Sequence, residues 1–148
     1  MALIDTALAT THLVVGALWV GSVVFFAVVV LPAARGGALN AEPLDSMVGS
    51  LTRGSRVAAV VMFLTGGHLT GTRYTFETLA STTNGNLVLV MLALWLGLTA
   101  LVEVGSSRLR DGLDRKKVRE PAANALGLFR GAAVAGALIF LTAGAIVG

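Results

Sequence analysis

This sequence of 148 residues has two histidines, and hydrophobic packing alone does not explain their positions. His12 stands just before the apolar run LVVGALWVGSVVFFAVVVL, and His68 lies in a second apolar stretch that ends in TGGHLTG. An ionisable ring within a membrane-length apolar segment is costly, and it normally faces other helices and has a partner there. Imidazole nitrogen is also a common ligand of haem iron and of copper. His12 and His68 are therefore the predicted metal-binding residues.

Small and aromatic residues share the helical faces of these histidines. Gly16 and Trp19 follow His12 by four and seven residues, and Gly71 follows His68 by three. Residues at these spacings lie on one face of a helix. Small residues beside an inward-facing imidazole leave space for a large flat group, and cofactor sites in helical bundles are built from facing side chains. The pattern therefore favours a haem b between His12 and His68, each as an axial ligand.

Two further residues extend this predicted cofactor site. Arg73 and Tyr74 follow the second apolar stretch, where they could form charge-assisted hydrogen bonds with haem propionates. A bis-histidine haem would serve electron transfer or another redox function, with a quinone or a redox protein as partner. Whether the protein is an enzyme is left open, and so is assembly with a second copy of the chain.

Other chemistry at the histidines gives the alternatives. The chain contains no cysteine, which excludes disulfides, thiolate metal sites and covalent c-type haem attachment. Zinc normally takes about four ligands, and only two histidines are present. Copper binds imidazole and thioether, and Met62 and Met91 lie in apolar stretches, although Met62 is expected about 9 Å deeper than His68. A bare metal site, copper import with these residues as successive ligands, and a purely structural role remain open.

The elements that position these residues are membrane helices. Hydrophobic residues make up 55% of the chain and charged residues 13%, with a mean hydropathy of +0.84. Four runs are long and apolar enough to cross about 30 Å of hydrocarbon. They cover about 8–31, 57–72, 87–104 and 123–147. The sequence therefore predicts an all-α, integral membrane four-helix antiparallel bundle, with residues 1–148 as a single domain in the lipid bilayer of the plasma membrane.

The charged connections predict the orientation. The first connection and its flanks carry three basic residues and the third carries six, whereas the opposite side carries only Arg73. By the positive-inside rule both basic connections lie in the cytoplasm and both termini outside. The segment RLRDGLDRKKVREP is then a solvated loop near anionic headgroups, and we expect no nucleic-acid partner. With helices antiparallel, His12 and His68 should both lie about 6 Å inside the outer boundary.

Two local expectations follow from the remaining charged and helix-breaking residues. Glu103 and Arg130 lie toward the cytoplasmic ends of the third and fourth runs, and an antiparallel hairpin should let them pair. The connection 35–55 contains Gly36, Gly37 and Pro43, and part of it is expected to form a short interfacial helix.

The stretch HLVVGALWVGSVVFFAVVVLP, from His12 onward, resembles the first helix of the copper-resistance protein D (CopD) domain and of the HemJ protoporphyrinogen oxidases. LTRGSRVAAVVMFLTGGHLTG looks like their second helix, and ANALGLFRGAAVAGALIFLTAG is similar to the last. The CopD resemblance implies copper uptake across the inner membrane. The HemJ resemblance implies protoporphyrinogen oxidation with bound haem, and His12 would be the family histidine. The third run, NGNLVLVMLALWL, lacks the lysine that these families often have there, which argues against the oxidase activity.

Overall fold

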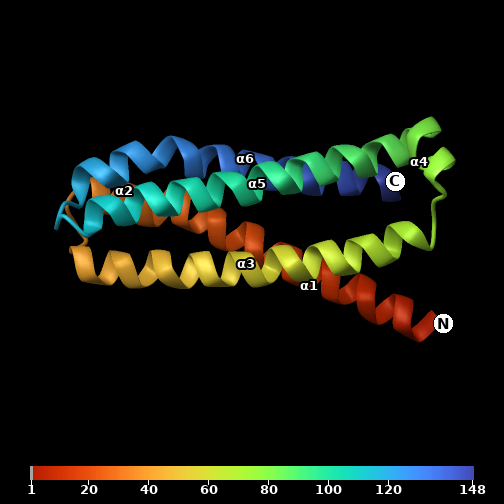
Figure 1. The fold of residues 1–148 in the computed structure, drawn as a ribbon, viewed down its shortest axis with the longest axis horizontal. Helices are drawn as coiled ribbons and strands as arrows, with labels where there is room; N and C mark the ends of the chain where they lie inside the picture. The colour runs from red at the N-terminus through yellow and green to blue at the C-terminus, as the bar shows by residue number, and fades with distance from the viewer. Residues whose placement is uncertain (1) are drawn as a thin grey trace.

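The computed structural model describes residues 2–148, which form helices joined by short turns (Figure 1). The elements in chain order are α1 (Ala2–Phe25), η1 (Phe26–Val30), α2 (Leu31–Arg35), α3 (Ala41–Gly71), α4 (Phe76–Ser81), α5 (Thr83–Leu113) and α6 (Arg119–Val147). No strand occurs among the described residues. The all-α class predicted from hydropathy is confirmed.

Four of the helical segments are long and apolar enough to cross a membrane: Ala2–Arg35, Ala41–Gly71, Thr83–Leu113 and Arg119–Val147. They run alternately up and down, and both termini lie at the same end of the bundle (Figure 1). We call this the outer end, following the prediction from loop charge, and the opposite end the basic end. The predicted four-helix antiparallel membrane bundle is therefore correct, but each helix is longer than its apolar run. Hydropathy marks the part of a helix in lipid, whereas backbone hydrogen bonding continues into polar sequence.

The first membrane helix is continuous but changes its hydrogen-bond register near its inner end. Leu31 N–H donates to Phe26 O, five residues back, so that Phe26–Val30 form a π-helical turn between α1 and α2. Pro32 follows directly and has no backbone N–H to donate to the carbonyl four residues earlier. A single wide turn is a common way to accommodate such a gap in the ladder. The helix thus reaches Arg35 without a break.

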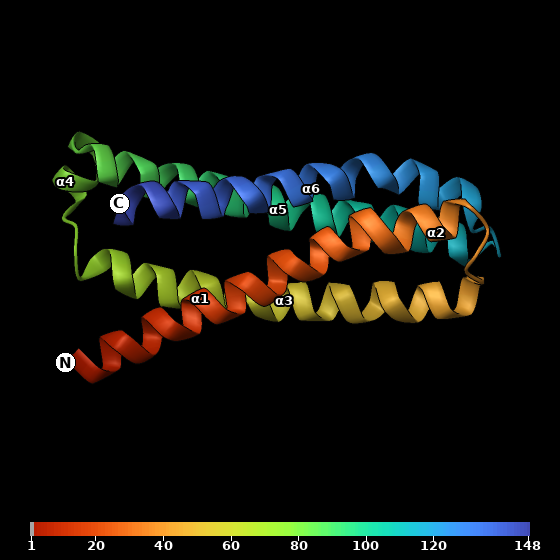
Figure 2. The same cartoon turned by 180° about the vertical axis from the view of Figure 1, so that it is seen from behind.

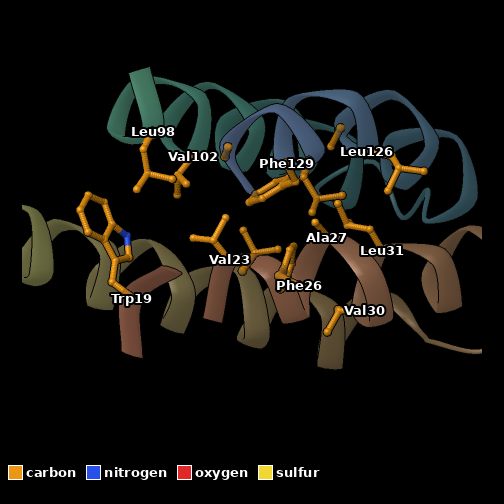
Figure 3. Close-up of a cluster of buried hydrophobic side chains, with 14 of the residues drawn as sticks. Trp19, Val23, Phe26, Ala27, Val30, Leu31, Leu98, Val102, Leu126 and Phe129 are labelled. Atoms are coloured by element: carbon orange, nitrogen blue, oxygen red, sulfur yellow. The ribbon is translucent and has the colours of Figure 1, made fainter. Parts of the chain in front are cut away.

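The apolar core occupies the basic-end part of the bundle (Figure 3). Phe26 and Phe129 pack against each other near its centre, with ring centroids 4.9 Å apart and ring planes inclined by 47°. On α1 the buried residues begin only at Gly16, and none lies between residues 2 and 15. Toward the N-terminus α1 diverges from α5 and α6 while it still crosses α3 (Figure 2). The outer end is therefore the loosely packed end of the molecule.

Close backbone contacts fix the basic end. Gly112 near the end of α5 lies directly against the ring of Pro121, in the first turn of α6, and no side chain would fit between them. Gly37 adopts a positive φ of 84°, and the Arg119 guanidinium packs against it. A residue with a Cβ would be disfavoured at Gly37 on both counts. These contacts hold the two basic connections together.

Two local expectations from the sequence are wrong. The connection between the first two membrane helices is only residues 36–40, because residues 41–55 form the first turns of α3 and no separate interfacial helix. Glu103 does not pair with Arg130. It accepts two hydrogen bonds from Arg56 of α3, at 2.7 Å from Nε and 2.9 Å from Nη2. Arg130 points outward from α6 and has no ion-pair partner among residues 2–148.

Candidate metal-binding site

His12 is held by α3 at the outer end of the α1–α3 interface. Its Nδ1 lies 2.7 Å from the Thr65 hydroxyl, and that hydroxyl also donates to Val61 O at 2.7 Å. A hydroxyl has one proton, so when Thr65 donates to Val61 O it accepts from His12, and the imidazole then carries its hydrogen on Nδ1. The lone pair of Nε2 is then free to bind a metal. A hydrogen bond of this kind is how proteins fix the tautomer and orientation of a ligating histidine.

The His12 ring also rests on the backbone of α3. A Cβ built on Gly66 would lie 2.9 Å from His12 Cε1, so that a side chain at position 66 would displace the ring from its present place. From its spacing, Gly71 is the small residue predicted to make space near His68. Gly66 has this role instead, because in this pair of antiparallel helices it is Gly66 that faces His12.

His68 has a different partner from His12, at a different level. Its Nε2 lies 3.1 Å from Oδ1 of Asp5, on the first turns of α1, and both side chains are about half exposed. His68 is two residues beyond Gly66 on α3, which places it about 3 Å farther toward the outer end than the His12 contact. The prediction that the two histidines meet between the helices is therefore wrong in detail. They mark two successive levels of the same α1–α3 interface.

Met62 gives a donor at a third level, deeper than His12. A Cβ on Gly16 would lie 3.0 Å from Met62 Cε and 3.4 Å from Sδ, so the thioether packs directly on this glycine. Gly16 follows His12 by one helical turn, and the thioether is accordingly about 6 Å deeper than the imidazole. Met62 was considered from the sequence, but its contact with the His12 face could be known only from the register of α1 on α3.

Trp19 closes this interface toward the core. It is 4% exposed, and its indole N–H donates to the Ser55 hydroxyl of α3. Its spacing from His12 predicts that Trp19, like Gly16, is a cofactor-binding residue. In the structure Trp19 lies at the edge of the apolar core (Figure 3), and its polar atom is satisfied by protein. The candidate metal donors of the α1–α3 interface therefore all lie on the outer side of Trp19.

The remaining predicted residues do not join this group. Gly71 is exposed at the end of α3, with nothing within 4 Å of a Cβ built on it. Arg73 and Tyr74 lie in the turn between α3 and α4, and within residues 2–148 their side chains form no hydrogen bond or ion pair. Met91 is partly buried on α5 and packs against the core.

The arrangement does not fit a haem between His12 and His68. A bis-histidine haem needs both imidazoles to face one slot as wide as a porphyrin. Here the His12 ring contacts Gly66, one turn below it Met62 contacts Gly16, and His68 is turned to Asp5. In the described part of the chain, no three His, Asp or Glu side chains form one metal-binding group. The geometry instead offers one or two donors at each of three levels.

Comparison with known proteins supports one of the two resemblances. No curated protein and no solved structure is significantly similar to the chain. The family model for copper resistance protein D matches residues 45–148, which contain Met62 and His68 but not His12 or Asp5. That match spans more than half of the sequence and three of the four membrane helices. The chain belongs to the copper resistance protein D family of multi-pass membrane proteins.

Proposed function

We propose that this protein takes up copper at the outer end of the bundle and passes it inward along the α1–α3 interface. The successive ligands would be Asp5 with His68, then His12, then the thioether of Met62. The observation that carries the proposal is the geometry of His12. Its Nδ1 is held by Thr65, its Nε2 is left as a donor, and a second copper-compatible donor lies one turn deeper.

The order of ligand types suits entry of a copper ion from water. Carboxylate and imidazole at the half-exposed outermost level suit a hydrated ion. Imidazole and thioether, the softer donors, follow where the interface is more buried. Ions cross a pathway when each position binds well enough to admit the ion and weakly enough to release it. One or two protein donors at each level meet that condition better than a closed four-ligand site does.

The family supplies the second line of support. A copper-resistance family of membrane proteins makes copper the expected substrate. Met62 and His68 lie within the matched segment, whereas α1 supplies the opposing His12 and Asp5 from outside it. The proposal therefore depends on α1, which lies outside the matched segment, for the opposing half of the pathway.

Copper uptake by whole cells tests the proposal directly. Cells that express the protein should accumulate more copper than cells with an empty vector, measured by elemental analysis after a short exposure. His12→Ala and Met62→Leu should each remove most of the increase. Met47→Leu is the matched control, because Met47 lies on the same helix near the basic end, is 43% exposed and belongs to no level of the pathway. Equal uptake by Met62→Leu and Met47→Leu would contradict the role of the thioether.

The haem b interpretation predicts a different result for the purified protein. A haem protein would show a reduced α band and near-stoichiometric pyridine haemochrome, and it would lose both in His12→Ala or His68→Ala while still inserting into the membrane. A copper pathway would show neither signal. One absorption spectrum of purified protein therefore separates the two functions.

A further inference from the structure

A second concave surface lies between α3 and α5, whereas the histidines lie between α1 and α3. These helices lie side by side (Figure 1), and the groove between them has a volume of about 350 Å³. Its main lining residues are Arg56, Val60, Phe63, Leu64, Trp95 and Thr99. Phe63 and Trp95 face each other across it, with ring centroids 5.5 Å apart. A groove of this volume is large enough for an ordinary small-molecule ligand.

The groove is apolar along its length and charged at one end. Arg56 stands where the polar part of α3 gives way to the apolar run 57–72. From Arg56 to Leu64 the groove follows α3 for about 12 Å into the apolar layer. Val60, Phe63 and Leu64 are more than half exposed, so the groove is open to the surrounding lipid. A molecule that fills it must therefore come from the bilayer.

Arg56 retains capacity to bind an anion at the mouth of this groove. Its guanidinium has five N–H groups, and Glu103 accepts from one on Nε and one on Nη2. Three donors remain, and the Arg56 side chain is 65% exposed. Arg53 lies one turn farther toward the basic end and is also exposed. The ion pair with Glu103 thus orients the guanidinium without using it up, which suits binding of a phosphate.

We propose that the α3–α5 groove binds one anionic phospholipid from the leaflet at the basic end. The phosphate contacts Arg56, and an acyl chain lies along Phe63 and Trp95. Charge complementarity selects an anionic headgroup over a zwitterionic one, because the nearby Arg53 leaves a net positive charge beside the groove mouth. The proposal does not depend on copper transport, because no residue that lines the groove is a ligand of the proposed copper pathway.

Quenching of tryptophan fluorescence by brominated lipids tests this site. The chain has two tryptophans, and subtraction of the signal of Trp95→Phe isolates the one in the groove. The full chain is reconstituted in phosphatidylcholine vesicles with a small fraction of brominated phosphatidylglycerol or brominated phosphatidylcholine. We expect an apparent affinity about fivefold higher for the phosphatidylglycerol, the gain that one basic residue gives near a membrane surface. Equal quenching by the two lipids would overturn the proposal.

Matched variants separate the groove from general surface charge. The triple variant Arg53→Gln/Arg56→Gln/Glu103→Gln removes both the guanidinium that contacts the phosphate and the nearby charge that selects an anionic headgroup, and it should abolish the preference. Arg130→Gln removes an exposed arginine of α6 that lies outside the groove, and it should leave the fivefold preference intact. An equal loss in Arg130→Gln would show that only overall surface charge matters, and the groove site would then be rejected.

A second approach avoids the ion pair altogether. Val60→Phe places a larger side chain at the groove surface, where Val60 is 58% exposed and packing of the bundle is little affected. It should remove the excess quenching by phosphatidylglycerol even if the Arg56 variants do not fold. Retained excess in Val60→Phe would overturn the proposal. So would organic extraction of purified protein that yields a stoichiometric quinone in place of a phospholipid.

Discussion

The thioether of Met62 lies against Gly16, one helical turn inside the imidazole of His12. Met62 Sδ is 3.4 Å from the position of a Cβ on Gly16, and Cε is 3.0 Å from it. Two residues that are 46 positions apart in the chain thereby set the depth of the thioether that the proposed copper pathway uses. Because Gly16 has no side chain, it allows the thioether to lie against α1, and a larger residue there would move the thioether.

Gly16→Ala should reduce copper uptake without unfolding the protein. The new methyl group displaces only the flexible end of Met62, so we expect a stability cost below about 1.5 kcal/mol. The thioether, however, moves away from the His12 face. Copper uptake and thermal unfolding in detergent measure the two effects. Gly21→Ala is the control, because nothing lies within 4 Å of a Cβ there, and a similar loss of uptake in that variant would contradict the argument.

Thr65→Val should weaken copper binding by about 10- to 100-fold, the usual cost of removing a partner that orients a metal ligand. Valine keeps the shape of threonine but cannot accept from His12 Nδ1, so the ring and its tautomer are no longer fixed. Titration of purified protein against a competing copper chelator measures the change. Thr65→Ser retains the hydroxyl and should bind nearly as well as the natural protein. Weak binding by the serine variant would point to packing as the cause.

Gly112→Ala should destabilise the α5–α6 hairpin by about 1–3 kcal/mol, because the neighbour of the new methyl group, the ring of Pro121, is rigid. The ring of Pro121 occupies the place of a Cβ at Gly112 and cannot rotate away. Thermal unfolding in detergent gives the measurement. At Gly127, on α6, a Cβ would meet nothing within 4 Å, so Gly127→Ala should leave stability unchanged or raise it. Equal destabilisation by both would contradict the contact.

Purified protein should lack a haem spectrum even when the cells are well supplied with haem. The reason is that His12 and His68 are engaged with Thr65 and Asp5 at different levels. The measurement is a difference spectrum of dithionite-reduced against oxidised protein, with a pyridine haemochrome assay. A sharp α band with one haem per chain would contradict this prediction and restore the bis-histidine interpretation.

The absence of cysteine makes the predicted orientation easy to test. Ser81, exposed at the end of α4, and Arg115, exposed in the basic connection, can each be replaced by a single cysteine. A membrane-impermeant maleimide should label Ser81→Cys in intact cells, and it should label Arg115→Cys only after permeabilisation. The reverse pattern would place the termini in the cytoplasm and the histidines at the inner face.

The fold class could be predicted from the sequence because membrane insertion depends on local properties. A run of about 20 apolar residues must be helical in lipid, where every backbone group needs an internal partner. Four such runs therefore gave four membrane helices, and they also drew attention to His12 and His68 as ionisable residues within them. The helix ends could not be predicted in this way. Helices α3 and α5 continue beyond their apolar runs into polar sequence, where hydropathy gives no signal for the end of a helix.

Pairing between helices was decided only by the tertiary structure. Glu103 contacts Arg56 and not Arg130, His12 contacts Thr65 and not His68, and neither outcome is visible in hydropathy. Contacts of this kind depend on the rotation of each helix about its axis and on its tilt against its neighbours. Both are set by how side chains pack, as where Phe26 meets Phe129 or Met62 meets Gly16. The sequence determined which residues enter the membrane, and packing determined which of them meet.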